Sequence, residues 1–166
     1  MATSRAWAEA YLAQARADLD AVSAIGSASP STSAMLWQMV FEKYAKAALL
    51  RQGSVALATV QTSHKAASRM IEALRRQRDV FSVLGGARVW EDVLWLVEAL
   101  ERAHPQLAQP TGPRLEYPWE DSAGEVWWPA KDLQIAQQLS DPRRGIAVRV
   151  LRFARLLDQH FEAMFA

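Results

Sequence analysis

The amino-acid sequence predicts an all-α protein, an up-and-down bundle of about five helices. Apolar residues recur every three or four positions in several long stretches, whereas no stretch alternates apolar and polar residues as a strand does. Gly and Pro separate these stretches and are scarce inside them. At 166 residues, of which 51% are hydrophobic and 22% charged, the chain is expected to be a single helical domain, residues 1–166.

The first helix is expected to begin at a cap on Thr3 or Ser4 and to end near Ile25. Apolar residues recur on one face of this stretch, at spacings of three or four: Trp7, Tyr11, Ala15, Leu19 and Val22. The turn-forming residues between Gly26 and Pro30 make a short connection, so the first two helices should pack as an antiparallel pair.

The second helix, from Pro30 to Gly53, is expected to lie at the centre of the bundle. Pro30 suits a first helical turn, and Ser31, Thr32 and Ser33 each offer a capping oxygen. Gly53 suits the left-handed conformation that often ends a helix. Apolar residues cover so much of the circumference of this helix that neighbours must pack against it from several sides.

Two further helices are expected over residues 64–78 and 87–104, on either side of a Gly-Gly pair. Thr62 or Ser63 is the expected cap of the first of them, whose apolar side is opposite a basic outer side. The segment 54–62 has mixed character, and we expect a loop there, with or without a helical turn.

The segment at about residues 105–130 is expected to be a long loop. It contains five prolines, a density at which no regular helix persists. It also holds four large aromatic residues: Tyr117, Trp119, Trp127 and Trp128. These rings are candidates to stack a nucleobase, but aromatic residues in a long loop more commonly pack that loop onto the rest of the domain.

The last helix is expected to begin with Asp141 as its cap and Pro142 as its first residue, after a short helical segment over residues 131–139. It should run to about Phe165 with an apolar stripe toward the bundle. Four arginines gather on the opposite face and form the arginine stripe: Arg144, Arg149, Arg152 and Arg155. The arginine stripe is either a surface for phosphates or an acidic partner, or a solvated face, and the sequence favours neither.

Composition excludes several classes of protein. Cysteine is absent, which excludes disulfides and thiolate metal sites and indicates a cytoplasmic location. Charges recur from the N-terminus onward, so neither a signal peptide nor a membrane-spanning segment is expected. The net charge of +1 does not indicate a nucleic-acid-binding protein. His64, His104 and His160 lie on separate elements without the spacing of metal ligands, so neither a metal site nor a cofactor is expected.

Three motifs follow one another in a recognisable order. They are Phe-Glu-Lys-Tyr-Ala-Lys-Ala-Ala-Leu-Leu at residues 41–50, Ser-His at residues 63–64 and Tyr-Pro at residues 117–118. From about residue 6 to residue 161, the chain resembles a HEPN domain, a helical module of prokaryotes and some eukaryotic proteins. The resemblance implies a helical bundle that commonly forms a homodimer. It also implies a nucleotidyltransferase partner in a two-component, toxin–antitoxin-like system, and binding of nucleotides or RNA.

Some members of that family are metal-independent ribonucleases with an Arg-x(4–6)-His motif at the start of the last long helix. The matching region here, residues 141–151, contains arginines but no histidine. Arg155 and His160 match the motif later in the same helix, about 140° apart around its axis. They are the catalytic alternative, with acid–base and phosphate-holding roles across a dimer. The plainer interpretation is a non-catalytic helix end, and the late position of the pair favours it.

Nine residues are candidates for binding a nucleotide-like or other anionic ligand: Lys43, Lys46, His64, Arg114, Tyr117, Trp119, Arg144, Arg149 and Arg152. Lys43 and Lys46 flank Glu42 on the central helix, where an ion pair is the commoner arrangement. His64 lies near a helix N-terminus, where capping or packing is commoner than anion binding. Arg114 stands two residues before the position where the family has arginine in its Arg-Tyr-Pro motif.

These patterns together predict a non-catalytic helical interaction or nucleotide-binding module that forms a homodimer and pairs with a nucleotidyltransferase. The alternative is an enzyme, a metal-independent ribonuclease that uses Arg155 and His160. A third interpretation is a structural bundle without a small ligand. Thermal stabilisation by nucleotides separates the first interpretation from the third.

Overall fold

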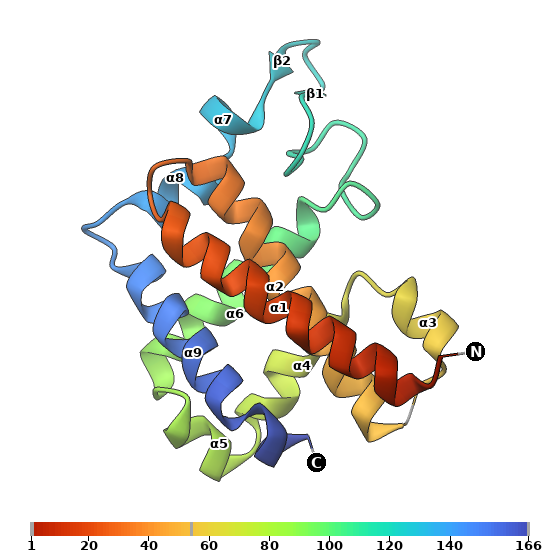
Figure 1. Cartoon of the computed structure of the whole chain (residues 1–166). Coiled ribbons are helices and arrows are strands. Elements are labelled where there is room, and N and C mark those ends of the chain that lie inside the picture. The colour runs from red at the N-terminus through yellow and green to blue at the C-terminus, as the bar shows by residue number, and fades with distance from the viewer. Residues whose placement is uncertain (1, 54, 166) are drawn as a thin grey trace.

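Five helices of ten or more residues build a bundle in the computed structural model, which describes residues 2–53 and 55–165 (Figure 1). These long helices are α1 (Ser4–Ile25), α2 (Pro30–Gln52), α4 (Ala66–Arg75), α6 (Ala87–Arg102) and α9 (Ile146–Met164). The shorter ones are α3 (Leu57–Gln61), α5 (Arg78–Val83), α7 (Pro129–Asp132) and α8 (Gln134–Ser140). The predicted all-α bundle is confirmed for the described residues, with α3 as the helical turn allowed for in the segment after α2.

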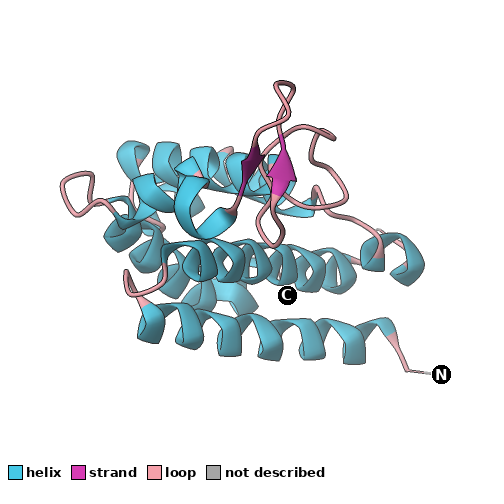
Figure 2. Ribbon diagram, turned by 90° about the horizontal axis from the view of Figure 1, so that it is seen from above, coloured by secondary structure: helices cyan, strands magenta, loops and turns pink. Residues whose placement is uncertain are grey.

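α1 and α2 form the antiparallel pair that their short connection predicts (Figure 2). The Thr3 side chain accepts a hydrogen bond from the Ala6 N–H (3.2 Å) and so caps α1. Gly26 ends α1, and its positive φ of 53° is a conformation that glycine adopts without strain. The chain can therefore reverse direction within a few residues and lay α2 along α1.

α2 lies at the centre of the bundle and packs against α1, α4, α6 and α8. Its buried apolar residues lie on several sides of the helix: Ala34, Trp37, Val40, Phe41, Tyr44, Ala45, Ala47, Ala48 and Leu50. The expected left-handed end is present at Gly53, which has φ of 64°. Because α2 is covered from several sides, its polar residues must find partners on neighbouring elements.

The predicted cap of α2 is wrong. Ser29 precedes the first helical residue, Pro30, and no side chain among the described residues caps the helix. The Ser29 and Thr32 hydroxyls hydrogen-bond to each other (2.7 Å). The Ser33 hydroxyl donates to the Gly26 carbonyl (2.5 Å) and so ties the start of α2 to the end of α1. These hydroxyls therefore form hydrogen bonds within the turn and do not accept from the N–H groups of the first helical turn.

The predicted cap of α4 is also wrong, and the helix begins two residues later than expected. Neither Thr62 nor Ser63 caps α4. Glu101 of α6 accepts hydrogen bonds from the Ser68 N–H (3.0 Å) and the Ser68 hydroxyl (2.7 Å). A carboxylate from a distant segment thus satisfies an N–H group of the first turn of α4. α4 ends at Arg75, and α5 follows as a separate short helix that the sequence did not predict.

The predicted start of the last helix is displaced. Asp141 accepts a hydrogen bond from the Arg143 N–H (2.9 Å) and so stabilises a turn, not the first turn of a helix. α9 begins at Ile146, after Gly145 in the left-handed region with φ of 61°. The short helical segment expected before it is divided into α7 and α8 by the extended residue Leu133.

A small hairpin interrupts the proline-rich loop, where the sequence indicated no strand. β1 (Trp119–Glu120) and β2 (Val126–Trp127) pair antiparallel, with Trp119 opposite Trp127. Figure 2 shows the hairpin projecting from the helices, and Figure 1 places it near the start of α2. Leu115 and Trp119 are buried, so part of this loop is anchored as predicted.

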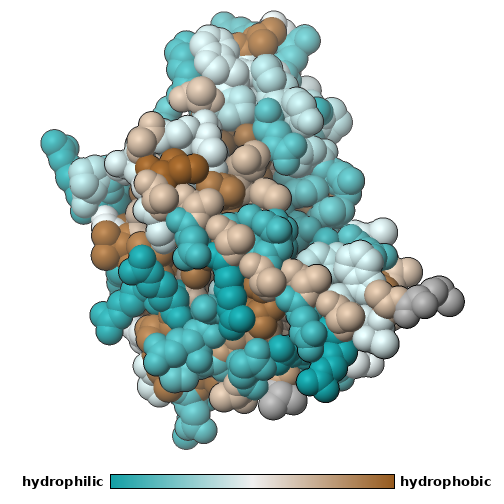
Figure 3. Space-filling view, in the orientation of Figure 1, coloured by the Kyte–Doolittle hydropathy of each residue, from teal (hydrophilic) through white to brown (hydrophobic). Residues whose placement is uncertain are grey.

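Aromatic rings fill the centre of the bundle where α2, α6 and α9 meet. Trp90 and Phe153 pack edge to face with their centroids 4.9 Å apart, and Phe41 packs beside Phe153. On the face in Figure 3, hydrophobic residues reach the surface in patches between hydrophilic ones. Within the described ranges, no helix combines the length and apolar character needed to cross a membrane.

Candidate functional site

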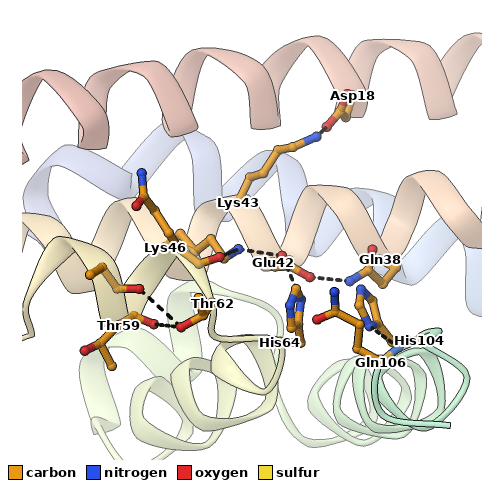
Figure 4. A network of polar contacts seen from close by, with 12 residues as sticks. Asp18, Gln38, Glu42, Lys43, Lys46, Thr59, Thr62, His64, His104 and Gln106 are labelled. Carbon is orange, nitrogen blue, oxygen red and sulfur yellow. Dashed lines mark hydrogen bonds and ion pairs between the residues drawn. The ribbon is translucent and has the colours of Figure 1, made fainter.

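The middle of α2 carries a polar network on a helix that is otherwise largely apolar (Figure 4). Glu42 forms an ion pair with Lys46 one turn later, with Oε1 and Nζ 2.8 Å apart. Gln38 donates a hydrogen bond to the second oxygen of Glu42. Lys46 is itself 5% exposed and also donates to the Gln61 carbonyl (3.0 Å), beside the Tyr11 ring. The network is therefore an internal one, shielded from solvent.

Two histidines from distant segments complete this network. His64 lies in the turn before α4, and His104 follows the end of α6. Their rings stack with centroids 4.4 Å apart and planes 24° apart. Nδ1 of His64 lies 3.6 Å from Oε1 of Glu42. Figure 4 shows both imidazoles directed toward Glu42, and we call these three residues the Glu–His cluster.

The electrostatics of the Glu–His cluster follow from its burial. Burial raises the pKa of Glu42, but the hydrogen bond and the charge of Lys46, together with the Gln38 hydrogen bond and the His64 charge, outweigh that effect, and the pKa lies below its usual range. Burial, followed by the nearby His64, lowers the pKa of His104. An ionised carboxylate and a neutral imidazole are consequently the favoured forms of these two groups at neutral pH.

The Glu–His cluster has the donor set of a transition-metal site. Each member offers one nitrogen or oxygen atom, and these three atoms lie within 4.8 Å of one another. Nδ1 of His64 is buried and has no hydrogen-bond partner among the described residues. A cavity of about 10 Å³ next to Glu42 and His64 has room for about one water-sized occupant.

A second hollow lies between the start of α2 and the proline-rich loop. This loop groove has a volume of about 390 Å³. Its lining includes hydroxyl, carboxylate, thioether and aromatic side chains: Ser31, Thr32, Met35, Glu116, Tyr117 and Trp128. The Tyr117 and Trp128 rings are 57% and 43% exposed, which is high for aromatic residues. The loop groove therefore presents two exposed aromatic residues beside hydrogen-bonding groups, with the Lys131 ammonium over the Trp128 ring.

The other two aromatic residues of the loop hold it in place. Trp119 is 7% exposed. The indole N–H of Trp127 donates to Asp121 (2.9 Å), which also accepts from the Ala123 and Glu125 N–H groups (2.8 and 3.0 Å). The sequence does not distinguish among the four aromatic residues of the loop. In the fold, Trp119 and Trp127 anchor the loop, whereas Tyr117 and Trp128 are exposed.

Both lysine candidates form ion pairs, which are commoner for such residues than anion binding. Lys43 pairs with Asp18 of α1, on the side of α2 away from the Glu–His cluster. Lys46 pairs with Glu42 within that cluster. Arg114 is half-buried, and its side chain lies 3.5 Å from the Pro110 carbonyl. These cations take part in local structure before any ligand is considered.

The fold divides the arginine stripe. Arg149 pairs with the buried Asp92 of α6 and also donates to the Arg144 carbonyl. Arg144 precedes α9 and lies 3.8 Å from the Asp141 carboxylate. Arg152 and Arg155 are exposed on α9. The first two arginines of the stripe therefore lie beside carboxylates, and only the last two are both exposed and on α9.

The catalytic alternative also lies on α9. Arg155 is exposed, and His160 is half-buried one turn and a half further along the helix. The two other histidines of the chain, His64 and His104, lie in the Glu–His cluster. His160 therefore lies on α9, apart from the cluster that contains the other two histidines.

Sequence reasoning missed the Glu–His cluster as a unit. Residues 42, 64 and 104 are far apart in the chain, and their spacing carries no ligand motif. One available signal was a carboxylate on a helix apolar all round, which must be paired internally. Trp128 was likewise considered only as one of four loop aromatics, because its exposure depends on how the loop folds.

Comparison of the chain with protein-family models, with curated proteins and with solved structures gave no match. The HEPN resemblance therefore rests on the three motifs named above. Two of their residues, Glu42 and His64, meet in the Glu–His cluster, and Tyr117 lies in the loop groove.

Proposed function

We propose that this chain is a non-catalytic helical module that binds a nucleotide-like ligand in the loop groove. The observation that carries this proposal is the pair of exposed rings, Tyr117 and Trp128, around a groove of about 390 Å³. That volume lies within the usual range for small-molecule sites. Exposed aromatic rings are stacking platforms for nucleobases, which all have a π-face.

The polar lining of the loop groove suits the remaining parts of a nucleotide. The Ser31 and Thr32 side chains can donate to phosphate or ribose oxygens, and they stand in the first turn of α2, where the helix dipole favours negative charge. Glu116 offers an acceptor for an exocyclic amino group or a ribose hydroxyl. Lys131 lies over the Trp128 ring (4.6 Å) and adds a positive charge near the rim.

The proposal includes a homodimer and a nucleotidyltransferase partner, both of which follow from the HEPN resemblance. In this two-component, toxin–antitoxin-like arrangement, the chain recognises a ligand and a partner protein and carries out no chemistry itself. A molecular-mass measurement at micromolar concentration tests the dimer directly. A strict monomer would remove the homodimer from the proposal.

Thermal stabilisation by nucleotides tests the binding function. Purified protein is heated with ATP, GTP or UTP in EDTA, so that no metal ion contributes. At least one nucleotide is expected to raise the unfolding temperature. Because each stacked base contributes about 1–3 kcal/mol, the Tyr117→Ala/Trp128→Ala double variant should bind it at least about fivefold more weakly.

Val126→Ala is the matched control for that measurement. Val126 is 64% exposed in β2, close in sequence to Trp128, but does not line the loop groove, so its variant should bind like wild type. Stabilisation by no nucleotide, or equal binding by the double variant, would contradict the proposal. RNA cleavage in EDTA by wild type and not by His160→Ala would replace it with the ribonuclease alternative.

A further inference from the structure

We propose that Glu42, His64 and His104 form a binding site for a transition-metal ion of the zinc type. Two imidazole nitrogens and one carboxylate oxygen are its protein ligands. The site is independent of the proposed nucleotide function, because it uses the middle of α2 and the segments next to α4 and α6. The fold brings these three residues, which are far apart in the sequence, together in a half-buried position.

The spacing of the donor atoms is close to that of a metal site. All three lie within 4.8 Å of one another, whereas two ligands of a tetrahedral site at zinc-bond lengths of about 2.0–2.2 Å are about 3.4 Å apart. Side-chain shifts of roughly 1 Å or less therefore close the site. A cavity of about 10 Å³ borders two of the three residues, Glu42 and His64.

The hydrogen bonding of the two histidines leaves ligand capacity in the cluster. Nδ1 of His64 is buried without a partner among the described residues, which is uncommon for a buried polar atom. Nδ1 of His104 accepts one hydrogen bond from the Gln106 N–H, at 3.3 Å. A metal ion on Nδ1 of His104 takes the place of this hydrogen bond directly. A metal ion on Nε2 requires a proton on Nδ1, which then can no longer accept from the Gln106 N–H. In both cases the ion replaces one long hydrogen bond.

The Lys46 ammonium opposes an ion at this position. It lies 2.8 Å from Oε1 of Glu42, and Gln38 occupies one lone pair of the other oxygen. Each carboxylate oxygen has two lone pairs, so Glu42 retains acceptor sites. Lys46 also has alternatives in the Gln61 carbonyl and the Tyr11 ring. The ammonium therefore weakens the site without blocking it.

The donor set selects the class of metal. Imidazole nitrogens combined with one carboxylate suit Zn²⁺ and its first-row neighbours, whereas Mg²⁺ and Ca²⁺ prefer oxygen ligands. Two histidines and one glutamate supply three protein ligands, which leaves a fourth position for water or another donor.

Calorimetric titration of the EDTA-treated and desalted full chain with ZnCl₂ tests the site. Wild type should bind one Zn²⁺ per chain and should not bind Mg²⁺ at the same concentration. The His64→Gln/His104→Gln double variant should bind Zn²⁺ at least about 100-fold more weakly, since it loses two ligands. The matched control is His160→Gln, which removes the third histidine of the chain and should bind like wild type. Equal binding by the double variant, or loss of binding in His160→Gln, would overturn the site.

A second measurement needs no variant, so it holds even if a substitution prevents folding. Imidazole nitrogen resonances of the wild-type protein are recorded by NMR before and after one equivalent of Zn²⁺. The His64 and His104 resonances should shift as ligands do, and those of His160 should not. A shift confined to His160, or no imidazole shift, would refute the proposal whatever the outcome of the nucleotide measurements.

Discussion

Two regions along α2 offer different chemistry on one helix. The middle of the helix holds the Glu–His cluster, where charged and polar groups are shielded and pair with one another. The start of the helix borders the loop groove, where aromatic rings and hydroxyls remain open to solvent. The first region is surrounded by α1, α3, α4 and α6, whereas the second is covered by an irregular loop.

This difference shows how packing decides what a residue can do. A carboxylate in the middle of a bundle must be matched by partners, and the matching groups then form a site with few degrees of freedom. An aromatic ring in a loop at the end of the bundle needs no partner and stays available to a ligand. Three comparisons test this difference, the first between the two regions and the other two within the loop.

The largest difference is expected between two glutamates. Glu42→Ala leaves the buried Lys46 ammonium without its carboxylate, so the free energy of unfolding should fall by about 4 kcal/mol. Glu116→Ala removes an exposed carboxylate at the loop groove and should change the free energy of unfolding by less than about 0.5 kcal/mol. Urea denaturation of both variants measures this contrast, and equal effects would show that the Glu–His cluster is not shielded.

Within the loop, an anchor and an exposed ring should also differ. Trp119→Ala removes a ring that is 7% exposed and should cost about 3 kcal/mol of unfolding free energy. Tyr117→Ala should cost less than about 0.5 kcal/mol, because its ring is mostly solvated. The same denaturation measurement applies. A large loss for Tyr117→Ala would mean that this ring supports the loop and is not free for a ligand.

The smallest effect expected is a pH dependence of the hairpin. The Glu125 N–H and then the Trp127 indole N–H donate to Asp121 and lower its pKa below the usual range. A lowered carboxyl pKa contributes stability that is present above about pH 4 and is lost as pH falls through the lowered value. The NMR signal of the Trp127 indole N–H should therefore shift below about pH 4. In Asp121→Asn that shift should be absent, and an identical shift there would assign it to another group.

Periodicity in the sequence was sufficient to predict the long helices. α1, α2 and α6 begin and end within two residues of the expected positions, because Thr3, Pro30 and the Gly-Gly pair are local signals. The starts of α4 and α9 were misplaced. Glu101 reaches α4 from another helix, and Asp141 stabilises a turn in place of a helix start. Local signals cannot reveal either arrangement, since each depends on how neighbouring segments fold.

The candidate sites were less predictable than the fold. In the sequence, Lys46 and His64 are separate candidates for binding an anion, and the spacing of His104 from the other histidines is not that of metal ligands. The ion pair between Lys46 and Glu42 joins residues one helical turn apart, so a sequence can indicate it. The stacking of His64 on His104 joins the ends of two helices packed side by side. Such a contact has no fixed separation in sequence.

The sequence by itself determined that this protein is an all-α bundle with a central, largely apolar α2 and a proline-rich loop. Those properties follow from side-chain periodicity and from prolines, which act over a few neighbouring residues. Only the tertiary structure decided that Glu42, His64 and His104 meet and that Tyr117 and Trp128 stay exposed. The physical reason is that burial and contact depend on which surfaces pack together, and packing joins residues regardless of their distance along the chain.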